Sequence, residues 1–190
     1  FNKEECVKMG EIIYKIMISN ILFSKIYSKL YSLYLFKYKF LNEILNLKIN
    51  NFIDYYNTEK NKELNNKLTF DELSIINNLI DKKNGEAHLF INLYLNQQIE
   101  TQKICDIINN LLELFFEITN LPNKIYLVDQ VSDILYIFIK DFYLDLKEDE
   151  RLENIINSVN YICNMKPSSR ESISNKSIFK FMDLKDEIKI

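Results

Sequence analysis

The sequence is poor in the residues that make tight turns and that build catalytic centres. It contains two glycines, two prolines, one histidine and no tryptophan among 190 residues. The strands of a sandwich or barrel need a tight turn roughly every 8 to 12 residues, so the shortage of glycine and proline argues against an all-β fold. Gly10 and Gly85 stand far apart, which excludes a glycine-rich phosphate-binding loop.

The sequence also lacks the residues that common catalytic and metal sites require. Because His88 is the one histidine, neither a Ser-His-Asp triad nor a histidine-based zinc site is expected, and His88 is assigned a structural or surface role. The acidic pairs fall at predicted helix starts or charged turns, where helix capping and solvation account for them: Glu4-Glu5, Asp71-Glu72 and Asp149-Glu150. We therefore predict a protein that is not an enzyme and that binds no cofactor and no metal.

The cysteines and the lengths of the hydrophobic runs indicate the cellular compartment. Cys6, Cys105 and Cys163 form an odd, widely spaced set among apolar neighbours, which predicts buried, reduced thiols and a reducing, cytoplasmic environment. No apolar run approaches the roughly 20 residues that span a bilayer, and no signal peptide opens the sequence. A net charge of −3 supplies no overall basic field for nucleic acid.

Hydrophobic residues are abundant, at 47%, and aromatic residues reach 13%, so a folded core is expected across 1–190 as a single domain. The preference for Asn, Lys, Ile and Tyr is typical of an A+T-rich coding genome, as in some protists and large DNA viruses. Apolar residues recur mostly at i, i+3, i+4 and i+7, which predicts an all-α protein.

The pattern predicts about nine helices. The first three cover about 4–19, 22–35 and 40–56, and a polar connection or frayed helix end follows at 57–67. A fourth starts at about Asp71 and ends near Asn84-Gly85, because glycine is favoured just past a helix C-terminus. Further breaks are expected at 96–98, 120–123, 147–151 and 167–174.

Apolar spacing also predicts which side of each helix faces the core. In the first helix the expected inner residues are Ile12, Ile13, Ile16 and Met17; in the second they are Phe23, Ile26, Tyr27, Leu30 and Leu33 or Tyr34; in the last they are Ile178, Phe179 and Met182. Core packing is also favoured over base stacking for the tyrosines of 27–38. Basic residues nevertheless interleave with them and form a local patch of RNA-contact candidates, Lys25, Lys29, Lys37 and Lys39.

Nine helices cannot share one central seam, so a four-helix bundle is disfavoured. Two consecutive helices make a helical hairpin of roughly 35 to 45 residues, and such hairpins bury their apolar faces by stacking on neighbouring hairpins. The expected fold is therefore an α-solenoid of stacked antiparallel helical hairpins, similar to HEAT repeats.

Several segments resemble the middle domain of eukaryotic translation initiation factor 4G. Phe23-Ser24-Lys25-Ile26-Tyr27 resembles that family's Phe-Ser-x-x-Tyr, and Phe40 to Phe52, with Ile44-Leu45 between, follows its Phe-x-x-x-Leu-Leu…Phe helix. Without a gap, the stretch from Gly85 to Leu112 carries Leu93-Tyr94, Asp106 and Leu111-Leu112 in the family's register, and Leu135 with Lys140-Asp141 matches a later helix.

The C-terminal part is similar to the family's Ser-Ser-Arg…Phe…Asp…Asp signature. Ser168-Ser169-Arg170 reproduces the tripeptide, while Ser174-Asn175-Lys176 is better spaced before Phe179, Asp183 and Asp186. The family's final Arg is missing, and Glu187 stands close to its expected place. The resemblance covers nearly the whole chain except a first helix upstream, whose absence would expose an apolar face near Ile12 and Ile16.

This resemblance implies a HEAT-repeat scaffold in cap-dependent translation, without an active site. Such a domain binds a DEAD-box RNA helicase of the factor 4A type, touches both of its lobes and stimulates the helicase's own ATP turnover. It also contacts RNA, while a cap-binding protein is bound through regions outside this chain. The family binds with inter-helix loops and helix ends, so the helicase-binding candidates are Asn84, Gly85, Glu86, His88, Asn120, Asn123, Lys124, Lys166, Ser168, Arg170 and Lys176.

Phe40, Phe52, Tyr94 and Phe179 are expected in the core instead of at a contact surface. Two alternatives remain open. The same fold also serves RNA decay, splicing, nuclear cap-binding and deadenylase scaffolds. A solenoid that binds RNA on its own would instead show RNA affinity that falls steeply with salt and does not depend on a helicase.

Overall fold

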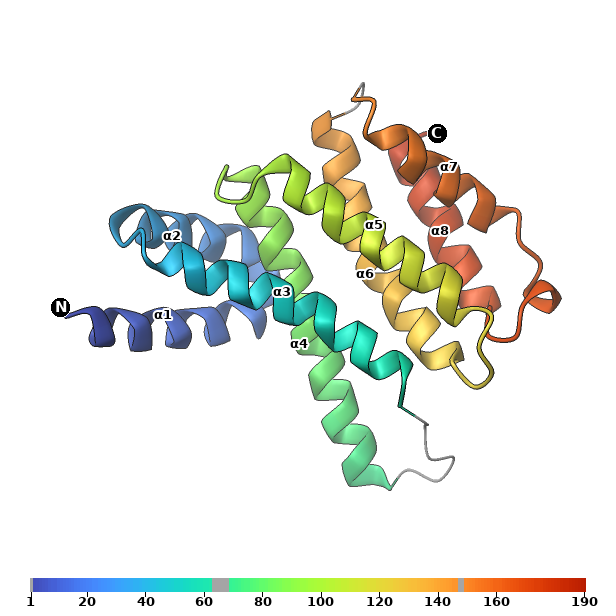
Figure 1. Cartoon of the computed structure of the whole chain (residues 1–190), viewed down its shortest axis with the longest axis horizontal. Helices are drawn as coiled ribbons and strands as arrows, with labels where there is room; N and C mark the ends of the chain where they lie inside the picture. Colours follow the sequence, from blue (N-terminus) through green and yellow to red (C-terminus); the bar gives the residue numbers. More distant parts are fainter. Residues whose placement is uncertain (1, 63–68, 147–148) are drawn as a thin grey trace. The chain divides into compact units, whose positions relative to one another are not determined.

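The computed structural model describes residues 2–62, 69–146 and 149–190. These residues form α-helices and two short 3-10 helices and contain no strand, which confirms the all-α prediction (Figure 1). The elements are α1 (Lys3–Ile18), η1 (Ile21–Phe23), α2 (Ser24–Lys37), α3 (Leu41–Lys60), α4 (Phe70–Leu95), α5 (Thr101–Ile118), α6 (Ile125–Leu146), α7 (Leu152–Cys163), η2 (Pro167–Ser169) and α8 (Asn175–Ile188).

Short polar side chains fix where several helices start. Thr69 caps α4: its side chain accepts a hydrogen bond from the Glu72 backbone N–H, and the Glu72 carboxylate accepts from the Thr69 N–H at 2.7 Å. Such a reciprocal box satisfies two backbone donors that have no partner inside the helix. Similar boxes start α1 at Asn2 and α8 at Ser174.

The predicted breaks at 96–98, 120–123 and 167–174 are confirmed as connections between helices. Two of them contain a residue in the left-handed region, Gln97 at φ 61° and Asn123 at φ 59°. The connection predicted at 57–67 and the charged turn at 147–151 extend into residues 63–68 and 147–148, which lie outside the described part of the chain.

The helix end predicted at Asn84-Gly85 is wrong, because α4 runs through both residues to Leu95. Two of the nine expected helices are therefore one. Gly85 serves a close approach between helices instead of a C-terminal cap: a Cβ atom built there would lie 1.8 Å from the Ile18 carbonyl oxygen. The last turn of α1 packs directly on the α4 backbone at this point.

The chain divides into two compact units, and unit 1 consists of Phe1–Phe52 and Leu68–Thr101. Within it α1 and α2 pack on each other and on α4. The second half of α4 forms the centre of this unit, with Leu89, Phe90, Ile91 and Leu93 fully buried. The first half of α4, from Phe70 to about Lys82, is mostly exposed, and Phe70 is 85% and Ile75 67% exposed.

The inner faces predicted for α1 and α2 are largely wrong. In α1 Met17 is buried as expected, whereas Ile12 is 55% and Ile16 46% exposed. In α2 the buried residues are Ser24, Ser28, Tyr31 and Leu35 instead of the expected Ile26, Leu30 and Leu33.

The reason lies in the contact between α2 and α4. The Asn92 side-chain amide donates to Ser24 Oγ at 3.0 Å, and the Asn96 amide donates to Ser28 Oγ at 3.1 Å. Buried amides require such partners, and the small serines bring the two helices close together. We call these four residues the polar seam. They place the apolar stripe of α2 on its opposite side.

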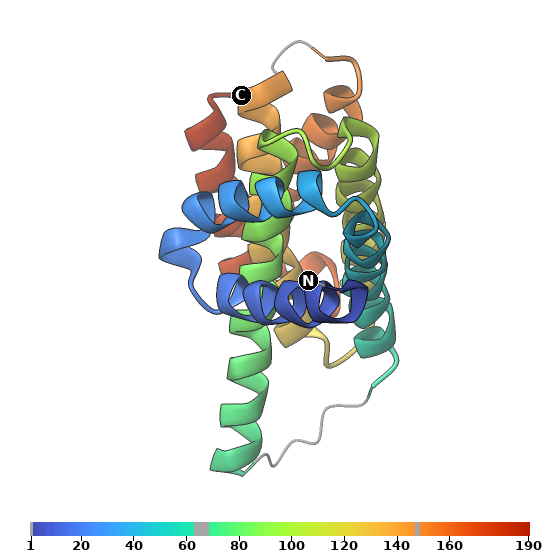
Figure 2. The same cartoon turned by 90° about the vertical axis from the view of Figure 1, so that its left-hand side faces the viewer.

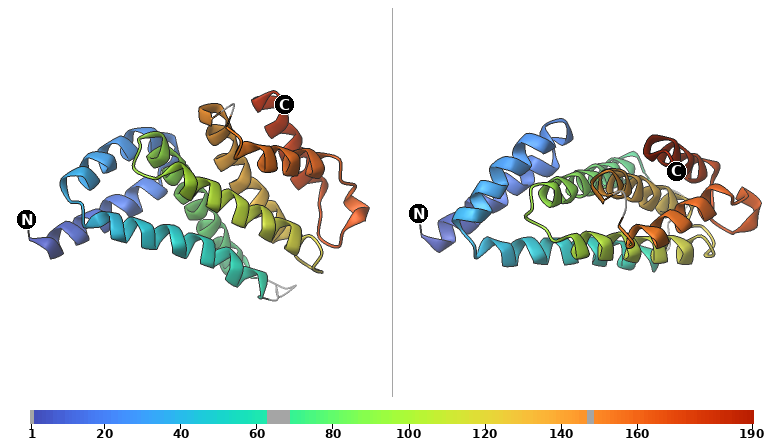
Figure 3. Two further views of the ribbon diagram at one scale, coloured as in Figure 1. Left: turned by 45° about the horizontal axis from the view of Figure 1, so that its top comes forward. Right: turned by 90° about the horizontal axis from the view of Figure 1, so that it is seen from above.

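Unit 2 consists of Ile53–Lys67 and Gln102–Ile190. Here α5 and α6 follow each other in opposite directions (Figures 1 and 3). Helix α8 packs on both α6 and α7. Phe115, Phe138, Phe142 and Phe181 fill the core, with Phe115 and Phe181 in edge contact at 5.3 Å. In α8 the expected core position of Ile178 is confirmed, whereas Phe179 is 58% and Met182 43% exposed because Phe181 and Leu184 face inward instead.

The other core expectations agree with the structure at Phe52 and Tyr94, which are buried, while Phe40 is half-buried. The three cysteines are free thiols; Cys6 and Cys105 are buried and Cys163 is half-buried. Burial raises the pKa of the Cys105 and Cys163 thiols above the usual value and so keeps them protonated. Within the described ranges, no helix is long and apolar enough to cross a membrane.

Candidate functional site

Two of the predicted helicase-binding segments, 120–124 and 166–176, are brought together in unit 2 by hydrogen bonds around Ser172. The Ser172 backbone N–H donates to the Thr119 carbonyl at 3.0 Å. The Ser172 hydroxyl donates to the Leu121 carbonyl at 2.5 Å and accepts from the Lys124 backbone N–H at 2.8 Å. The α5–α6 connection and the α7–α8 connection therefore form one surface, which we call the connector surface.

Arg170 strengthens this junction from the side. Its guanidinium donates to the Phe116 carbonyl and to Thr119 Oγ1, each at 3.0 Å, and lies 5.7 Å from the centre of the Phe116 ring. Lys124 is buried, and its ammonium donates to the Lys62 carbonyl at 2.5 Å. Both side chains were predicted as contacts for a partner, but their hydrogen bonds are made within unit 2 and hold the connector surface in place.

The remaining predicted residues of this region are available to a partner. Asn120, Asn123, Lys166 and Ser168 are exposed. Lys176 is exposed at the start of α8, with its ammonium 3.6 Å from the Asp129 carboxylate. The connector surface thus offers two amides, a hydroxyl and two ammonium groups, a set suited to hydrogen bonds and ion pairs with an acidic protein surface.

A shallow pocket of about 530 Å³ adjoins the connector surface, and the residues that line it are Phe116, Asn154, Asn157, Ser158, Tyr161 and Arg170. The rings of Phe116 and Tyr161 meet edge to face at 5.9 Å, and Tyr161 is 57% exposed. Sequence reasoning missed this pocket apart from Arg170. Its signal was the polar spacing of Asn154, Asn157 and Tyr161 along one side of α7, opposite the apolar stripe.

The other predicted segment, Asn84 to His88, lies in unit 1 in the middle of α4, not in a loop. Glu86 is the centre of a network there: its carboxylate accepts from the Tyr14 hydroxyl at 2.9 Å and pairs with the Lys83 ammonium at 2.7 Å. The side chains of Lys83 and Glu86 are 12% and 13% exposed, and Gly85 is buried. These contacts make the segment part of the packing between α1 and α4.

This network predicts how stability depends on pH. Burial, and then the Glu86 carboxylate, raise the pKa of Tyr14 far above the usual value near 10, and burial raises the pKa of Tyr31 to about 12. Above pH 10 the unfolded chain releases protons that the folded chain keeps, so the free energy of unfolding must fall as pH rises. Between pH 10 and 11, the free energy of unfolding of Tyr14→Phe is expected to fall by roughly 1 kcal/mol less than that of the wild type.

Urea unfolding at pH 9, 10 and 11 measures this difference. Tyr161→Phe is the matched control, because Tyr161 is 57% exposed, and it should follow the wild-type curve. Equal slopes for Tyr14→Phe and the wild type would mean that Tyr14 ionises as easily in the folded chain as in the unfolded one.

The RNA-contact candidates lie on or next to α2. Lys25, Lys29 and Lys39 are exposed, and the Lys37 ammonium lies 5.4 Å from the centre of the Tyr38 ring. The prediction that the tyrosines of this region pack inward is confirmed for Tyr31, which is buried. Tyr34 is half-buried, and its hydroxyl donates to the Cys6 carbonyl at 2.9 Å.

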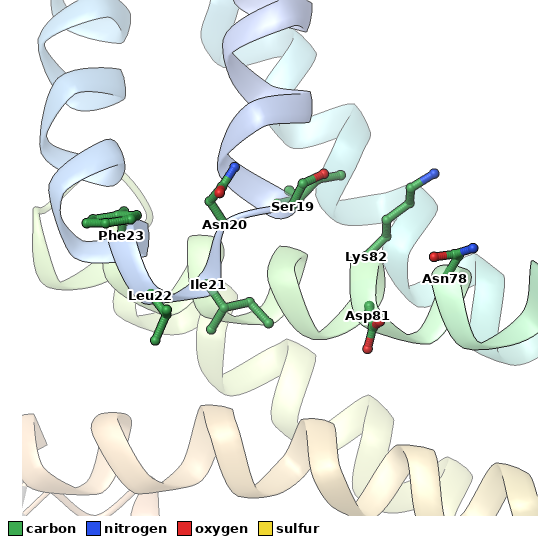
Figure 4. A pocket seen from close by; sticks show the side chains of 9 residues that line it. Ser19, Asn20, Ile21, Leu22, Phe23, Asn78, Asp81 and Lys82 are labelled. Atoms are coloured by element: carbon green, nitrogen blue, oxygen red, sulfur yellow. The ribbon is translucent and has the colours of Figure 1, made fainter. Parts of the chain in front are cut away.

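A second pocket, of about 430 Å³, lies in unit 1 between the α1–α2 connection and the first half of α4 (Figure 4). Ile21, Leu22 and Phe23 form its apolar side, and Asn78, Asp81 and Lys82 of α4 form its polar side. Among the residues with described positions, no group of three or more His, Cys, Asp or Glu side chains is arranged to hold a metal ion.

Comparisons with protein-family models, with curated proteins and with solved structures give no match for this chain.

Proposed function

We propose that the chain is an α-solenoid scaffold domain of the initiation factor 4G middle-domain type, which binds a DEAD-box RNA helicase and raises its ATP turnover. The observation that carries this proposal is the connector surface. Segments 120–124 and 166–176 were selected from the resemblance at separate places in the sequence, and they are joined through Ser172 into a single surface. A rigid surface of polar side chains held by buried hydrogen bonds suits a protein-binding scaffold.

The paired helices support the solenoid part of the proposal. In unit 2, α5 and α6 follow each other in opposite directions (Figure 3), and α8 packs on both α7 and α6. In the same unit, Lys140 and Glu187 form an ion pair, and Glu187 also accepts from the Tyr136 hydroxyl at 2.5 Å. Glu187, which stands close to the place of the family's missing arginine, thus has a partner on α6.

A scaffold without catalytic groups stimulates a helicase by population shift. It must bind one arrangement of the two helicase lobes more tightly than the others, and the rate gain is limited by that difference in affinity. In this proposal the connector surface holds a lobe through Lys166, Ser168 and the exposed amides. The chain itself performs no chemical step.

The test is a binding titration and an RNA-stimulated ATPase assay with a factor 4A-type helicase. Saturable binding with raised turnover is expected, and Lys166→Glu combined with Ser168→Asp should weaken binding at least tenfold, since two contacts become repulsive to an acidic partner. Lys189→Glu is the matched control, because Lys189 is exposed at the opposite end of α8; it should leave binding unchanged.

Three results would contradict the proposal in different ways. Absence of binding, in an assay where a known scaffold works, would remove the helicase as a partner. Binding to helicases of RNA decay or splicing alone would keep the scaffold and change the process. Tight binding to RNA without helicase, with steep salt dependence, would favour a solenoid that acts on RNA alone.

A further inference from the structure

The outward sides of α1 and α2 in unit 1 carry large apolar side chains. On η1 and α2 the exposed fractions are 94% for Leu22, 65% for Ile26, 52% for Leu30 and 69% for Leu33. These residues recur at intervals of three and four, so they form one stripe along the helix. A stripe of this kind normally packs in a core, and its exposure marks an interaction surface.

The outward side of α1 has the same character. Met9 is 42%, Ile12 55% and Ile16 46% exposed. We call the two outward stripes together the N-terminal face.

The two helices that carry these stripes are neighbours. The helices run antiparallel beside each other and both cross α4 from the same side (Figure 2). They approach closely, since a Cβ atom at Gly10 of α1 would lie 3.6 Å from the Tyr34 ring of α2. An apolar surface carried by two neighbouring helices is of the kind on which a third helix packs by its own ridges.

The polar seam prevents this surface from being turned inward. Successive residues of a helix are separated by about 100°, so Ser24 and Ile26 are about 200° apart. Rotating α2 to bury Ile26, Leu30 and Leu33 would break the hydrogen bonds of Ser24 and Ser28 to the amides of Asn92 and Asn96. The exposed stripe is therefore a fixed feature of the folded unit.

The charges around the N-terminal face are mainly positive. Helix α2 contains Lys25, Lys29 and Lys37 and neither Asp nor Glu. The acidic residues of α1 are engaged elsewhere: Glu5 caps the helix, while Glu4 pairs with Lys8 and Glu11 with Lys48. A partner that buries the apolar stripes thus meets ammonium groups along α2, which favours carboxylates on that partner.

We propose that the N-terminal face binds an amphipathic α-helix of a partner protein, with apolar residues on one side and Asp or Glu along its flanks. Helix α2 has 14 residues and spans about 21 Å at 1.5 Å per residue, which matches roughly four turns of such a helix. Lys25 and Lys29 lie where flanking carboxylates would reach them. This binding is separate from helicase binding at the connector surface and does not depend on it.

The experiment uses the full chain and two designed peptides of the same length. Both carry Leu at positions 3 and 4 apart on one side; one has Glu at the flanking positions and the other Lys. Fluorescence anisotropy should show saturable binding of the Leu/Glu peptide and at least tenfold weaker binding of the Leu/Lys peptide. Raising the salt concentration should reduce this difference, because exposed charges are screened.

Variants locate the site. Ile26→Glu with Leu33→Glu should weaken binding of the Leu/Glu peptide at least tenfold. Ile75→Glu is the matched control, because Ile75 is 67% exposed on α4, close to the 65% of Ile26, and it should change the affinity less than twofold. Circular dichroism should show wild-type helix content for both, since the substituted side chains are exposed.

Several outcomes would overturn the proposal. These are no binding of the Leu/Glu peptide, equal binding of both peptides, or equal loss in the Ile75→Glu control. The proposal would also be overturned if the Ile26→Glu, Leu33→Glu double variant still binds the peptide but loses another interaction of the chain. That interaction could be self-association, binding to vesicles of anionic lipid or binding to single-stranded RNA. Each of those results would assign the N-terminal face to a different occupant.

Discussion

Gly85→Ala is expected to lower the free energy of unfolding by about 3 kcal/mol, near the upper end of what overpacking a tight site costs. The added methyl group would lie 1.8 Å from the Ile18 carbonyl oxygen and 2.6 Å from the carbonyl carbon. Both atoms belong to the backbone, so a change of side-chain rotamer cannot relieve the clash. The end of α1 must move away from α4.

Gly10→Ala is the matched control within the same unit. Its nearest neighbours would be side-chain atoms of Tyr34 and Leu41 at 3.6 to 3.9 Å, which is ordinary contact. Alanine is favoured over glycine inside a helix by about 1 kcal/mol, so Gly10→Ala should be neutral or stabilising. Urea unfolding followed by circular dichroism compares the two. Equal effects would mean that α1 does not pack on α4 at Gly85.

Glu86→Ala is expected to cost roughly 2 to 4 kcal/mol, because removing one member of a buried ion pair leaves its partner poorly compensated. The carboxylate serves both the Lys83 ammonium at 2.7 Å and the Tyr14 hydroxyl at 2.9 Å. With Lys83 and Glu86 at 12% and 13% exposed, water replaces little of this interaction. Glu86→Gln should cost less, since its amide oxygen still accepts from Tyr14.

An exposed pair provides the control for this second substitution. Glu117 accepts from the Lys60 ammonium at 2.9 Å, but its side chain is 54% exposed. Surface pairs contribute about 0 to 1 kcal/mol, so Glu117→Ala should change the free energy of unfolding by less than about 1 kcal/mol. If Glu86→Ala changes the free energy of unfolding by an equally small amount, the segment 84–88 does not stabilise the fold. That result would favour its predicted role in binding a partner.

The presence of the helices and most of their ends could be predicted from local sequence patterns. Thr69 with Glu72 is a capping box, and the breaks at 96–98 and 120–123 carry the polar and proline signals of turns. Gly85 was misjudged because glycine has two uses. It ends helices where a left-handed residue is needed, and it also lets another backbone approach. Sequence spacing alone does not separate these uses.

The orientation of α2 failed for a related reason. Hydrophobic spacing assumes that the most apolar side of a helix is buried, but the polar seam buries Ser24 and Ser28 instead. Serine and asparagine pair across helices through tertiary contacts, which no local pattern reveals. The same limit applies to Lys124 and Arg170, whose partners Lys62 and Phe116 are distant in sequence.

The uneven burial of α4 has a consequence for cooperativity. A helix of about a dozen residues is marginal in water, mainly because its first turn is costly to form. The exposed half of α4 avoids that cost because the buried half, from Gly85 onward, already supplies the nucleus. Its residues join or leave the helix one at a time at the Thr69 end, while the packed half unfolds only with unit 1. One continuous helix thus contains one part that unfolds gradually and one part that unfolds cooperatively with unit 1. The boundary between them lies where α1 meets Gly85.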